Sequence, residues 1–424
     1  MKGSPYRIAA AIATALAIAA VASIARGQSP QTVMVPMRDG VRLATDVYVP
    51  DGDGPWPTAL ICTPYSRKGA QGFAKQALER GYALVAQDFR GRFDSEGDDY
   101  PVFLAGGWGE HQDGYDTVEW IARQEWSNGK VGGFGMSAPG IALNMMAPSR
   151  PPHLVCCYVS VAFSSMYHQA AYQGGAFRKA LLETWLTLSE FSPKNLELFR
   201  AHPDYDDFWR AFDCESVADR VNIPTMYVGG WYDIFVAGTL NSFVTVHKQG
   251  DQGARGKCRL VMEPYGHGRN EDLVFPNTGH LQAADMWNWF DVWLKNDGRG
   301  IEEIPVIQYY VMGDPGDPNT PGNRWRTADD WPLPADRRKI YFHTDKRLRL
   351  RPPQDLFGSL SYEYDPRDPV STIGGANLTI SKGPMDQRPV EGRPDVLLFD
   401  SPVFDRYIEI TGLVTVKLWA SSTA

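Results

Sequence analysis

The sequence has little cysteine, and its few cysteines are not spaced as metal ligands or as a redox pair. Five occur among 424 residues, at positions 62, 156, 157, 214 and 258. All but Cys214 lie in apolar, strand-like runs, where a free cysteine behaves as a small hydrophobic residue. An oxidising compartment would permit one disulfide, but the adjacent Cys156 and Cys157 would point to opposite faces of any strand. We predict no metal site and no disulfide.

Positive charge is also scarce, and so are the motifs of nucleotide and nucleic-acid binding. Lysine and arginine number 42 against 50 aspartates and glutamates, a net charge of −8. The chain shows no phosphate-binding loop, no low-complexity tract and no internal repeat. An acidic protein is a poor partner for nucleic acid or for anionic membrane surfaces. We therefore expect a globular protein without nucleic-acid partners or cofactors, and the sequence leaves open whether it forms a homo-oligomer.

One long hydrophobic run is present, at the N-terminus. Lys2 and Arg7 precede an apolar stretch over 8–25, and Ala25-Arg26-Gly27 supplies small residues at a plausible cleavage site. This pattern predicts a secretory signal peptide over 1–27 and a periplasmic or secreted protein. Removing it deletes three arginines and lysines and no acidic residue, so the net charge falls from −8 to −11. An uncleaved membrane anchor is the alternative, because the run approaches the length of a spanning helix.

After the signal, the hydrophobic pattern predicts an α/β domain. A hairpin is expected around Asp39-Gly40, followed by alternating strands and helices. Buried strands are predicted over 58–65, 82–91, 129–134 and 153–163, with helices over 72–81 and 112–126. This alternation is typical of a parallel sheet covered by helices. We assign 28–164 to the first part of this domain.

The remaining sequence divides into three further segments. Residues 165–218 are helical and aromatic in character and predict an inserted helical cap. Strand patterns return at 224–233 and 258–268, and an amphipathic helix follows at 283–296, so 219–312 is the second part of the α/β domain. Residues 313–424 contain short β patterns between Pro- and Gly-rich turns, which predict a jelly roll. No closing strands follow the last β pattern, so we expect this jelly roll to be incomplete.

The segment GKVGGFGMSAPG at 129–140 raises the question of a nucleophile. It predicts a strand, a sharp turn at Ser137 and the start of a helix. Glycines on both sides of a serine suit the strained turn called a nucleophile elbow, where larger side chains would collide with the strand or helix. The spacing Gly-x-Ser-x-x-Gly is one residue longer than usual. The alternative is an ordinary serine in a glycine-rich turn.

Two further residues stand where partners of a nucleophilic serine should lie. Asp233 follows one predicted strand, and His267 follows the next. A serine needs a base, and the base needs an orienting acid; the order serine, acid, histidine is that of α/β-hydrolases. The backbone N–H of Ala138 and the hydroxyl of Tyr65 could donate to an oxyanion. Each residue alone would be an ordinary loop residue, but together they predict a catalytic triad.

These residues lie in motifs that resemble a known family. The motifs are, in order along the chain, Thr-Pro-Tyr at 63–65, QDFRGRFDSEGDDY at 87–100, DTVEWIARQEWSNGKVG at 116–132, GGWYD at 229–233, Gly-His-Gly at 266–268, WFDVWLKN at 289–296, YYVMG at 309–313, YDPRDPVSTIGG at 364–375 and GPMDQRPVEGRPDVLLF at 383–399. From about residue 33 to its end, the chain resembles the cocaine esterase-like (CocE/NonD) serine hydrolases of the X-Pro dipeptidyl-peptidase class.

The resemblance implies an α/β-hydrolase domain with an inserted helical cap and a C-terminal jelly roll. It also implies Ser137 as nucleophile, His267 as base and Asp233 as the residue that orients it, with Tyr65 and the Ala138 amide as oxyanion hole. The family commonly has tyrosine after the nucleophile, where this chain has Ala138-Pro139. Because only the backbone N–H of residue 138 is required, this departure concerns the acyl pocket.

The expected reaction is hydrolysis of carboxylic ester or amide bonds in small molecules. Alternatives are an X-Pro dipeptidyl-peptidase and an α-amino acid ester hydrolase, which need an anchor for a substrate ammonium. Ile234, Phe235 and Val236 follow Asp233, where α-amino acid ester hydrolases place carboxylates. Acids at 204, 206 and 207 could replace them, although such a run is usually a solvated face. A binding protein with an inert hydrolase domain is the non-enzymatic alternative. We interpret the loop with Arg90, Arg92 and Glu96 as salt-bridged.

Overall fold

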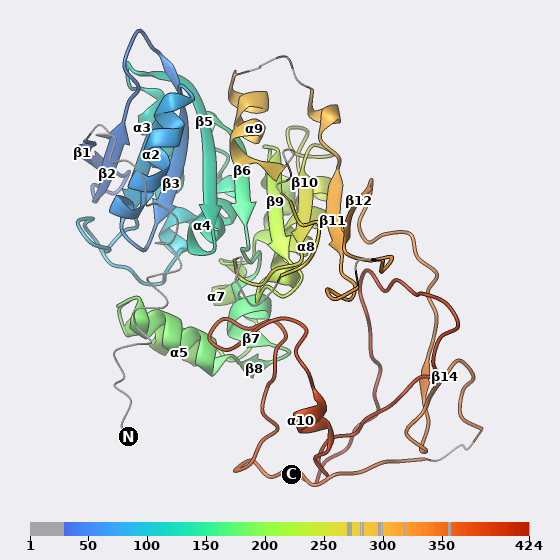
Figure 1. The fold of residues 1–424 in the computed structure, drawn as a ribbon. Coiled ribbons are helices and arrows are strands. Elements are labelled where there is room, and N and C mark those ends of the chain that lie inside the picture. Colours follow the sequence, from blue (N-terminus) through green and yellow to red (C-terminus); the bar gives the residue numbers. More distant parts are fainter. Residues whose placement is uncertain are drawn as a thin grey trace, which may run out of the picture. The chain divides into compact units, whose positions relative to one another are not determined.

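The computed structural model describes residues 29–423 except 269–273, 280, 282–283, 296–297, 299, 318 and 355–357. Figure 1 labels the helices and strands of the described chain. The chain divides into two compact units. The first unit lies within Met1–Val228, Ala237–Cys258 and Gln282–Ile301. The second unit lies within Gly229–Val236, Arg259–Leu281 and Glu302–Ala424. The predicted signal peptide falls outside the described residues. Among those that are described, no helix is long and apolar enough to cross a membrane.

The bounds of the elements agree with the predicted alternation of strand and helix. The strands are β1 (Gln31–Pro36), β2 (Arg42–Tyr48), β3 (Trp56–Thr63), β4 (Ala83–Asp88), β5 (Ser127–Met136), β6 (Leu154–Ser160), β7 (Tyr172–Gln173), β8 (Ala176–Phe177), β9 (Thr225–Gly230), β10 (Arg259–Glu263), β11 (Ile307–Val311), β12 (Arg324–Ala328), β13 (Tyr341–Phe342) and β14 (Leu348–Arg349). The α-helices are α2 (Gln71–Glu79), α3 (Asp113–Ala122), α4 (Ala138–Met146), α5 (Lys179–Leu188), α6 (Lys194–Ala201), α7 (Asp207–Arg210), α8 (Val236–Gln249), α9 (Met286–Phe290) and α10 (Arg388–Glu391).

The large sheet is mostly parallel. Its hydrogen-bonded strand order is β1-β2-β4-β3-β5-β6-β9-β10-β11-β12. The pairs β3/β4, β3/β5, β5/β6, β6/β9 and β10/β11 are parallel, whereas β1/β2, β2/β4 and β11/β12 are antiparallel. The turn of the predicted hairpin is closed by Gly40 at φ 86°, a conformation that suits glycine. The expected α/β fold class is confirmed.

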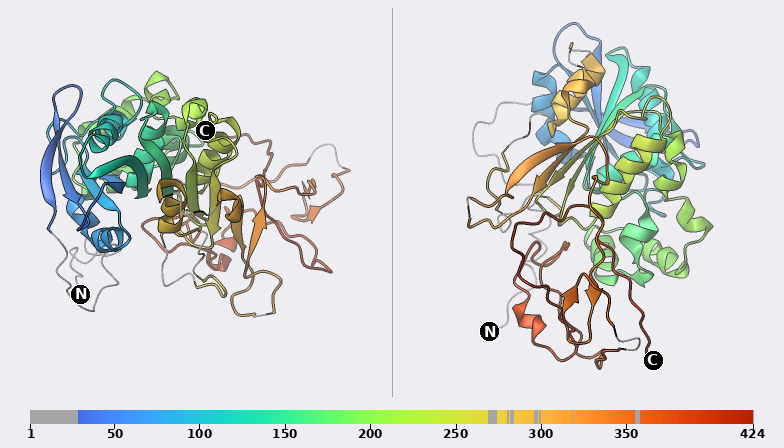
Figure 2. Two further views of the ribbon diagram at one scale, coloured as in Figure 1. Left: turned by 90° about the horizontal axis from the view of Figure 1, so that it is seen from above. Right: turned by 90° about the vertical axis from the view of Figure 1, so that its right-hand side faces the viewer.

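Two neighbouring glycines of β5 show how helices cover both faces of the sheet in the first unit. A Cβ on Gly132 would lie 2.9 Å from Phe290 of α9, and one on Gly133 would lie 2.5 Å from Leu143 of α4. Successive strand residues point to opposite faces. The helix α9 therefore covers one face and α4 the other, each close enough to require glycine. Helices flank the strands of this unit in the views of Figure 2 as well.

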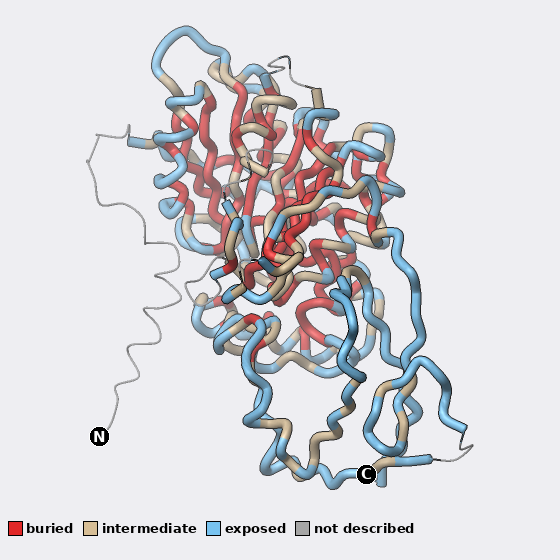
Figure 3. The backbone as a smooth tube through the Cα atoms, turned by 45° about the vertical axis from the view of Figure 1, so that its right-hand side comes forward, coloured by how far each residue is buried: buried red, intermediate tan, exposed pale blue. Residues whose placement is uncertain are grey.

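The strands of this sheet form the core. Every residue of β4 and of β9 is buried, as expected of parallel strands covered on both faces (Figure 3). The cysteines predicted to be small hydrophobes, Cys62, Cys156, Cys157 and Cys258, are buried free thiols.

The cap segment is helical, as predicted, with one difference. Its aromatic side chains form a core in which Phe199, Trp209 and Phe212 are fully buried. The difference is the short antiparallel hairpin β7/β8, which the sequence analysis did not predict. Gly174 and Gly175, both at positive φ, form its two-residue turn. Such a Gly-Gly turn is a hairpin signal, but the flanking strands are only two residues long and carry too little pattern to recognise.

The C-terminal part of the second unit departs from the predicted strands. Within the segment predicted to form a jelly roll, residues 395–422 have an alternating β pattern but form no strand among the residues that the structure describes, and they contribute one isolated bridge, at Asp400. Apolar residues in this stretch are exposed, including Leu413 at 89% and Trp419 at 84%. A β-strand forms only where a neighbouring strand pairs with its backbone N–H and C=O groups. The alternation of apolar and polar side chains does not specify such a partner strand.

Candidate active site

Ser137 occupies the turn between β5 and α4, where the sequence predicts an elbow. Its backbone has φ 58° and ψ −126°, values that a residue with a side chain rarely adopts. Its N–H donates to the carbonyl of Ser160 at 2.9 Å, and its carbonyl accepts from Ile141 at 2.8 Å, which fixes the turn to the next strand and to the helix. Ser137 remains partly exposed. The chain thus holds this serine in a strained position with access to solvent.

Gly135 and Gly140, the two glycines of the Gly-x-Ser-x-x-Gly motif, are both required because backbone atoms lie too close for a side chain. A Cβ on Gly135 would lie 2.3 Å from the carbonyl carbon of Pro139. A Cβ on Gly140 would lie 2.9 Å from the carbonyl oxygen of Gly135 and 3.1 Å from that of Ser160. The second glycine is needed one position later than usual because it is residue 140 whose Cα faces the end of β5. Pro139 is accommodated in the first turn of α4, where a backbone N–H has no partner within the helix.

Ala138 is the first residue of α4 and is buried. The first N–H groups of a helix find no acceptor within the helix and carry its positive dipole end. The amide of Ala138 is one of these groups, so it suits the stabilisation of a developing negative charge.

Asp233 and His267 meet in the second unit. Nδ1 of His267 lies 2.6 Å from Oδ1 of Asp233, whose side chain is fully buried, while that of His267 is 10% exposed. An ionised carboxylate accepts this hydrogen bond, so the ring proton lies on Nδ1 and Nε2 is the basic nitrogen. The ring also contacts Phe235 edge to face, with centroids 5.5 Å apart. Of the predicted partners, the structure therefore brings the acid and the histidine together.

Backbone hydrogen bonds hold the two loops that carry this pair. The N–H of Trp231 donates to Glu263 and that of Tyr232 to Tyr265, each at 2.9 Å. A Cβ on Gly230 would lie 2.2 Å from the carbonyl oxygen of Tyr265, so only glycine permits this approach. The GGWYD motif thus positions its aspartate through its glycine.

Tyr65 follows β3 in the first unit, and its hydroxyl has a partner that the sequence analysis missed. Nε1 of Trp185, in α5, donates to the tyrosine oxygen at 2.8 Å. The indole can only donate, so the tyrosine oxygen accepts and its own proton remains available for another acceptor. The residue is 36% exposed, but desolvation of its hydroxyl raises the pKa of Tyr65 to about 12. Tyr65 is a neutral donor at physiological pH.

Other charged residues singled out in the sequence have structural roles. Arg90 pairs with Asp39 at 2.7 Å and with Asp113 at 2.6 Å, as expected for a salt-bridged loop, while Glu96 pairs with Arg42. Two of the three cap acids singled out in the sequence have local partners. Asp206 caps α7 and lies 2.6 Å from the ring of His202, which lowers its pKa. Asp207 pairs with Arg210.

Family comparisons agree with this geometry. Residues 39–197 and 187–269 match the X-Pro dipeptidyl-peptidase (S15) family, and 299–424 match the X-Pro dipeptidyl-peptidase C-terminal non-catalytic domain. The cocaine esterase of Rhodococcus sp. (strain MB1 Bresler) is 30% identical over 92% of this chain and 77% of its own length.

Solved structures show the same fold. An α-amino acid ester hydrolase superposes with a TM-score of 0.71 at 23% identity, covering 93% of this chain and 76% of its own. An aminopeptidase from a marine sediment Thaumarchaeota archaeon gives 0.70 at 22%, covering 90% of this chain and 74% of its own. The protein therefore belongs to the S15 family of hydrolases, among its cocaine esterase-like (CocE/NonD) members, and combines an α/β-hydrolase fold with the family's C-terminal non-catalytic domain.

Proposed function

We propose that the chain is an exported serine hydrolase that cleaves carboxylic ester bonds of small molecules through an acyl-enzyme on Ser137. The observation that carries the proposal is the elbow, which holds Ser137 at φ 58° between β5 and α4. Strain of this kind is retained at sites where function needs it. The cocaine esterase relative and the S15 family support a serine ester hydrolase.

In the proposed mechanism, His267 acts as the base for Ser137. Nε2 accepts the hydroxyl proton while the serine oxygen attacks the ester carbonyl. Asp233, bonded to Nδ1, keeps the ring in the required tautomer and stabilises its positive charge. The imidazolium then protonates the departing alcohol as the carbon–oxygen bond breaks. A water molecule activated by the same nitrogen attacks the acyl-enzyme, releases the carboxylic acid and returns the proton to Ser137.

The tetrahedral intermediates carry a negative oxygen, for which we propose two donors. One is the N–H of Ala138, and the other is the hydroxyl of Tyr65, which the donation from Trp185 leaves free to donate its proton. The pKa of Tyr65, raised to about 12, keeps that proton in place over the working range of an esterase. Both groups thus supply hydrogen bonds without needing to reorganise.

Esters that carry no ammonium group suit the residues after Asp233 and the cap acids better than X-Pro peptides or amino acid esters do. The residues after Asp233 are apolar, with Ile234 and Phe235 buried. The cap acids Asp206 and Asp207 are paired with His202 and Arg210. These positions therefore offer no anchor for a charged amine. Side-by-side kinetics on a benzoyl ester, an amino acid ester and an X-Pro anilide would rank the three activities.

Labelling by a fluorophosphonate tests the nucleophile. Mass spectrometry of the purified protein should show a single adduct on the peptide that contains Ser137, and Ser137→Ala should show none. Ser149→Ala is the matched control, because Ser149 lies one helix further along the same segment and bonds only to a local carbonyl. A folded protein that gives no adduct would contradict the proposal and favour a binding protein with an inert hydrolase domain.

Export is proposed from the sequence alone. The charged residues at positions 2 and 7 and the apolar run over 8–25 favour a cleaved signal. N-terminal sequencing of protein recovered from the periplasm or medium should begin near residue 28. Recovery of an intact N-terminus with the membrane fraction would instead support a retained anchor.

A further inference from the structure

Arg92 is a buried arginine on the loop that follows β4, and the groups that it contacts below all lie in the first unit. Its Nε donates to the carbonyl oxygen of Pro64 at 3.3 Å. Its two terminal nitrogens donate to the carbonyl oxygens of Glu190, at 2.7 Å, and of Ser189. The guanidinium also lies 4.3 Å from the ring centroid of Phe191. One side chain thus binds two backbone segments that are more than a hundred residues apart in the sequence.

Both segments carry a member of the Tyr65–Trp185 hydrogen bond. Pro64 directly precedes Tyr65, and Ser189 is the residue that ends α5, four positions after Trp185. The carbonyl of Ser189, the residue that caps the C-terminus of α5, has no donor within the helix and lies at the negative end of its dipole, and the carbonyl of Glu190 follows it directly. A buried guanidinium can bind both carbonyls, because its planar fork offers five donors in fixed directions. Arg92 therefore fixes the end of α5 relative to the loop of Tyr65.

A second set of contacts joins the loop of Arg92 to the cap. Asp99 lies 3.3 Å from Nη1 of Arg92 and accepts from the backbone N–H of Ser192 at 3.0 Å. Asn195, fully buried in α6, accepts from the N–H of Val102 at 2.8 Å and donates to the carbonyl of Asp99 at 3.2 Å. Arg92 is thus the centre of a polar network.

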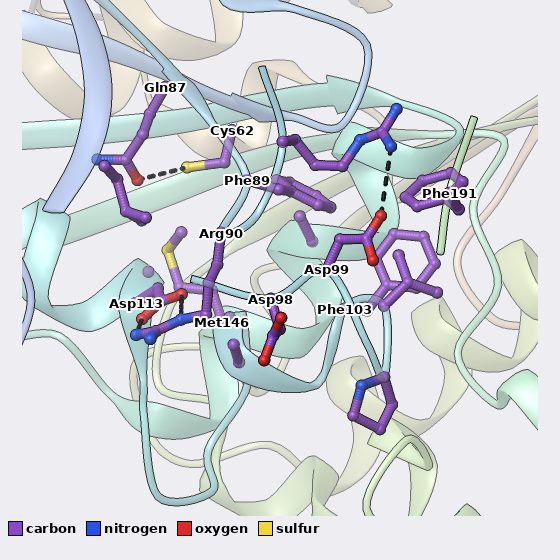
Figure 4. Close-up of a pocket in the computed structure, with 18 residues that line it drawn as sticks. Cys62, Gln87, Phe89, Arg90, Asp98, Asp99, Phe103, Asp113, Met146 and Phe191 are labelled. Carbon is purple, nitrogen blue, oxygen red and sulfur yellow. Dashed lines mark hydrogen bonds and ion pairs between the residues drawn. The ribbon is translucent and has the colours of Figure 1, made fainter. Parts of the chain in front are cut away.

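The packing around this network is incomplete. A cavity of about 50 Å³ lies beside it, with Phe89, Phe103 and Phe191 among its lining residues (Figure 4). Asp99 and Phe191, both labelled in Figure 4, are among the residues that line this cavity. Because a void withholds dispersion contacts from the side chains around it, the position of the loop depends more on its hydrogen bonds than it would in a filled core.

We infer that Arg92 is a positioning residue for the oxyanion donor Tyr65. The inference rests on the proposed function and goes beyond it by naming the group that sets the donor's place. Arg92 touches no reacting atom; it fixes Pro64 on one side and the end of α5 on the other, so that Trp185 orients the tyrosine hydroxyl. Removing the guanidinium should therefore weaken stabilisation of the transition state more than binding of the ester.

The test measures kcat and KM on an activated ester for Arg92→Met, Arg92→Lys and Tyr65→Phe, and for each Arg92 variant combined with Tyr65→Phe. Arg42→Met is the matched control, because Arg42 pairs with Glu96 at the exposed surface near the same loop. Melting temperatures are recorded for every variant. Arg92→Lys keeps the positive charge but lacks the planar guanidinium, so it can be compared with the parent even if Arg92→Met does not fold.

Arg92→Met should lower kcat about tenfold or more with little change in KM, since misplacing a catalytic group by about 1 Å can cost up to a hundredfold. The kcat of Arg92→Lys should lie between those of the parent and Arg92→Met, and the kcat of Arg42→Met should equal that of the parent. In the Tyr65→Phe background, either Arg92 change should lower kcat by less than about twofold, because residues that act through one another are not additive.

Equal losses in both backgrounds, or an unchanged kcat in Arg92→Lys and Arg92→Met, would overturn the inference. If the parent is labelled on Ser137 by a fluorophosphonate and hydrolyses the ester, either result contradicts the role of Arg92 and leaves the proposed function intact. A Tyr65→Phe enzyme as active as the parent would overturn both this inference and the proposed role of Tyr65. An unlabelled parent would overturn the proposed function itself.

Discussion

The elbow offers a perturbation whose size can be worked out from the structure: Gly135→Ala. The new methyl carbon would lie 2.3 Å from the carbonyl carbon of Pro139, 2.5 Å from its oxygen and 2.6 Å from the nitrogen of Gly140. Carbon atoms in contact are about 3.5 Å apart, so the start of α4 must move away from β5 by roughly 1 Å. All three obstructing atoms are backbone, so no side-chain rotation can relieve the clash.

The movement falls on the residues between positions 135 and 139, which include Ser137 and the Ala138 amide. Displacing a nucleophile and an oxyanion donor by about 1 Å should lower kcat/KM by about a hundredfold. The assay is hydrolysis of a p-nitrophenyl ester, with the rate of fluorophosphonate labelling measured in parallel. Both rates should fall together, because both depend on the position of the serine oxygen.

Gly109→Ala is the matched control, since a Cβ at that position meets nothing within 4 Å and its φ is ordinary. Its kcat/KM should equal that of the parent. The reasoning is refuted if Gly135→Ala folds with a kcat/KM within about twofold of Gly109→Ala, because a shift of this size cannot leave a nucleophile in place.

Three further predictions concern Tyr65 and its loop. Tyr65→Phe should lower kcat about a hundredfold with little change in KM, as loss of one oxyanion donor does elsewhere; an unchanged kcat would remove Tyr65 from the mechanism. Because burial raises the pKa of Tyr65 from 10 to about 12, its contribution to stability is intact below pH 10 and is lost as the pH rises through about 12; a tyrosinate titrating near 10 in the parent and missing in Tyr65→Phe would contradict this. Arg67→Met should reduce the free energy of unfolding by about 3–5 kcal/mol, because it leaves the buried carboxylates of Asp46 and Asp88 unpaired; a loss below about 1 kcal/mol in denaturant melts would count against it.

The elbow and the Asp233–His267 pair could be anticipated because each is encoded locally. Glycine at 135 and 140 marks a close approach, and strand ends followed by aspartate or histidine mark one edge of a parallel sheet. The structure confirms the elbow geometry and the contact between the acid and the histidine. Their catalytic roles stay predictions, as do the predicted domain boundaries.

The roles of Trp185 and Arg92 could not be predicted, because their hydrogen-bond partners lie far away in the sequence and no local motif indicates them. Trp185 reads as one more aromatic of the cap core, and its bond to Tyr65 spans 120 residues. Arg92 reads as part of a salt-bridged loop, yet most of its hydrogen bonds go to backbone carbonyls, which carry no sequence signal. In the C-terminal region, the alternating pattern over 395–422 predicts strands, but pairing depends on a neighbour that the pattern does not specify.

The central claim, an acyl-enzyme on Ser137, is tested most directly by acid-quenching the reaction with a slowly deacylating aryl ester and measuring the mass of the peptide that contains residue 137. The account predicts a mass increase equal to the acyl group, on that serine only, together with a burst of released phenol equal to the enzyme concentration. The adduct should be lost in Ser137→Ala and should form far more slowly in His267→Ala. Steady turnover with no acylated peptide at any quench time, or acylation of a different residue, would contradict the claim.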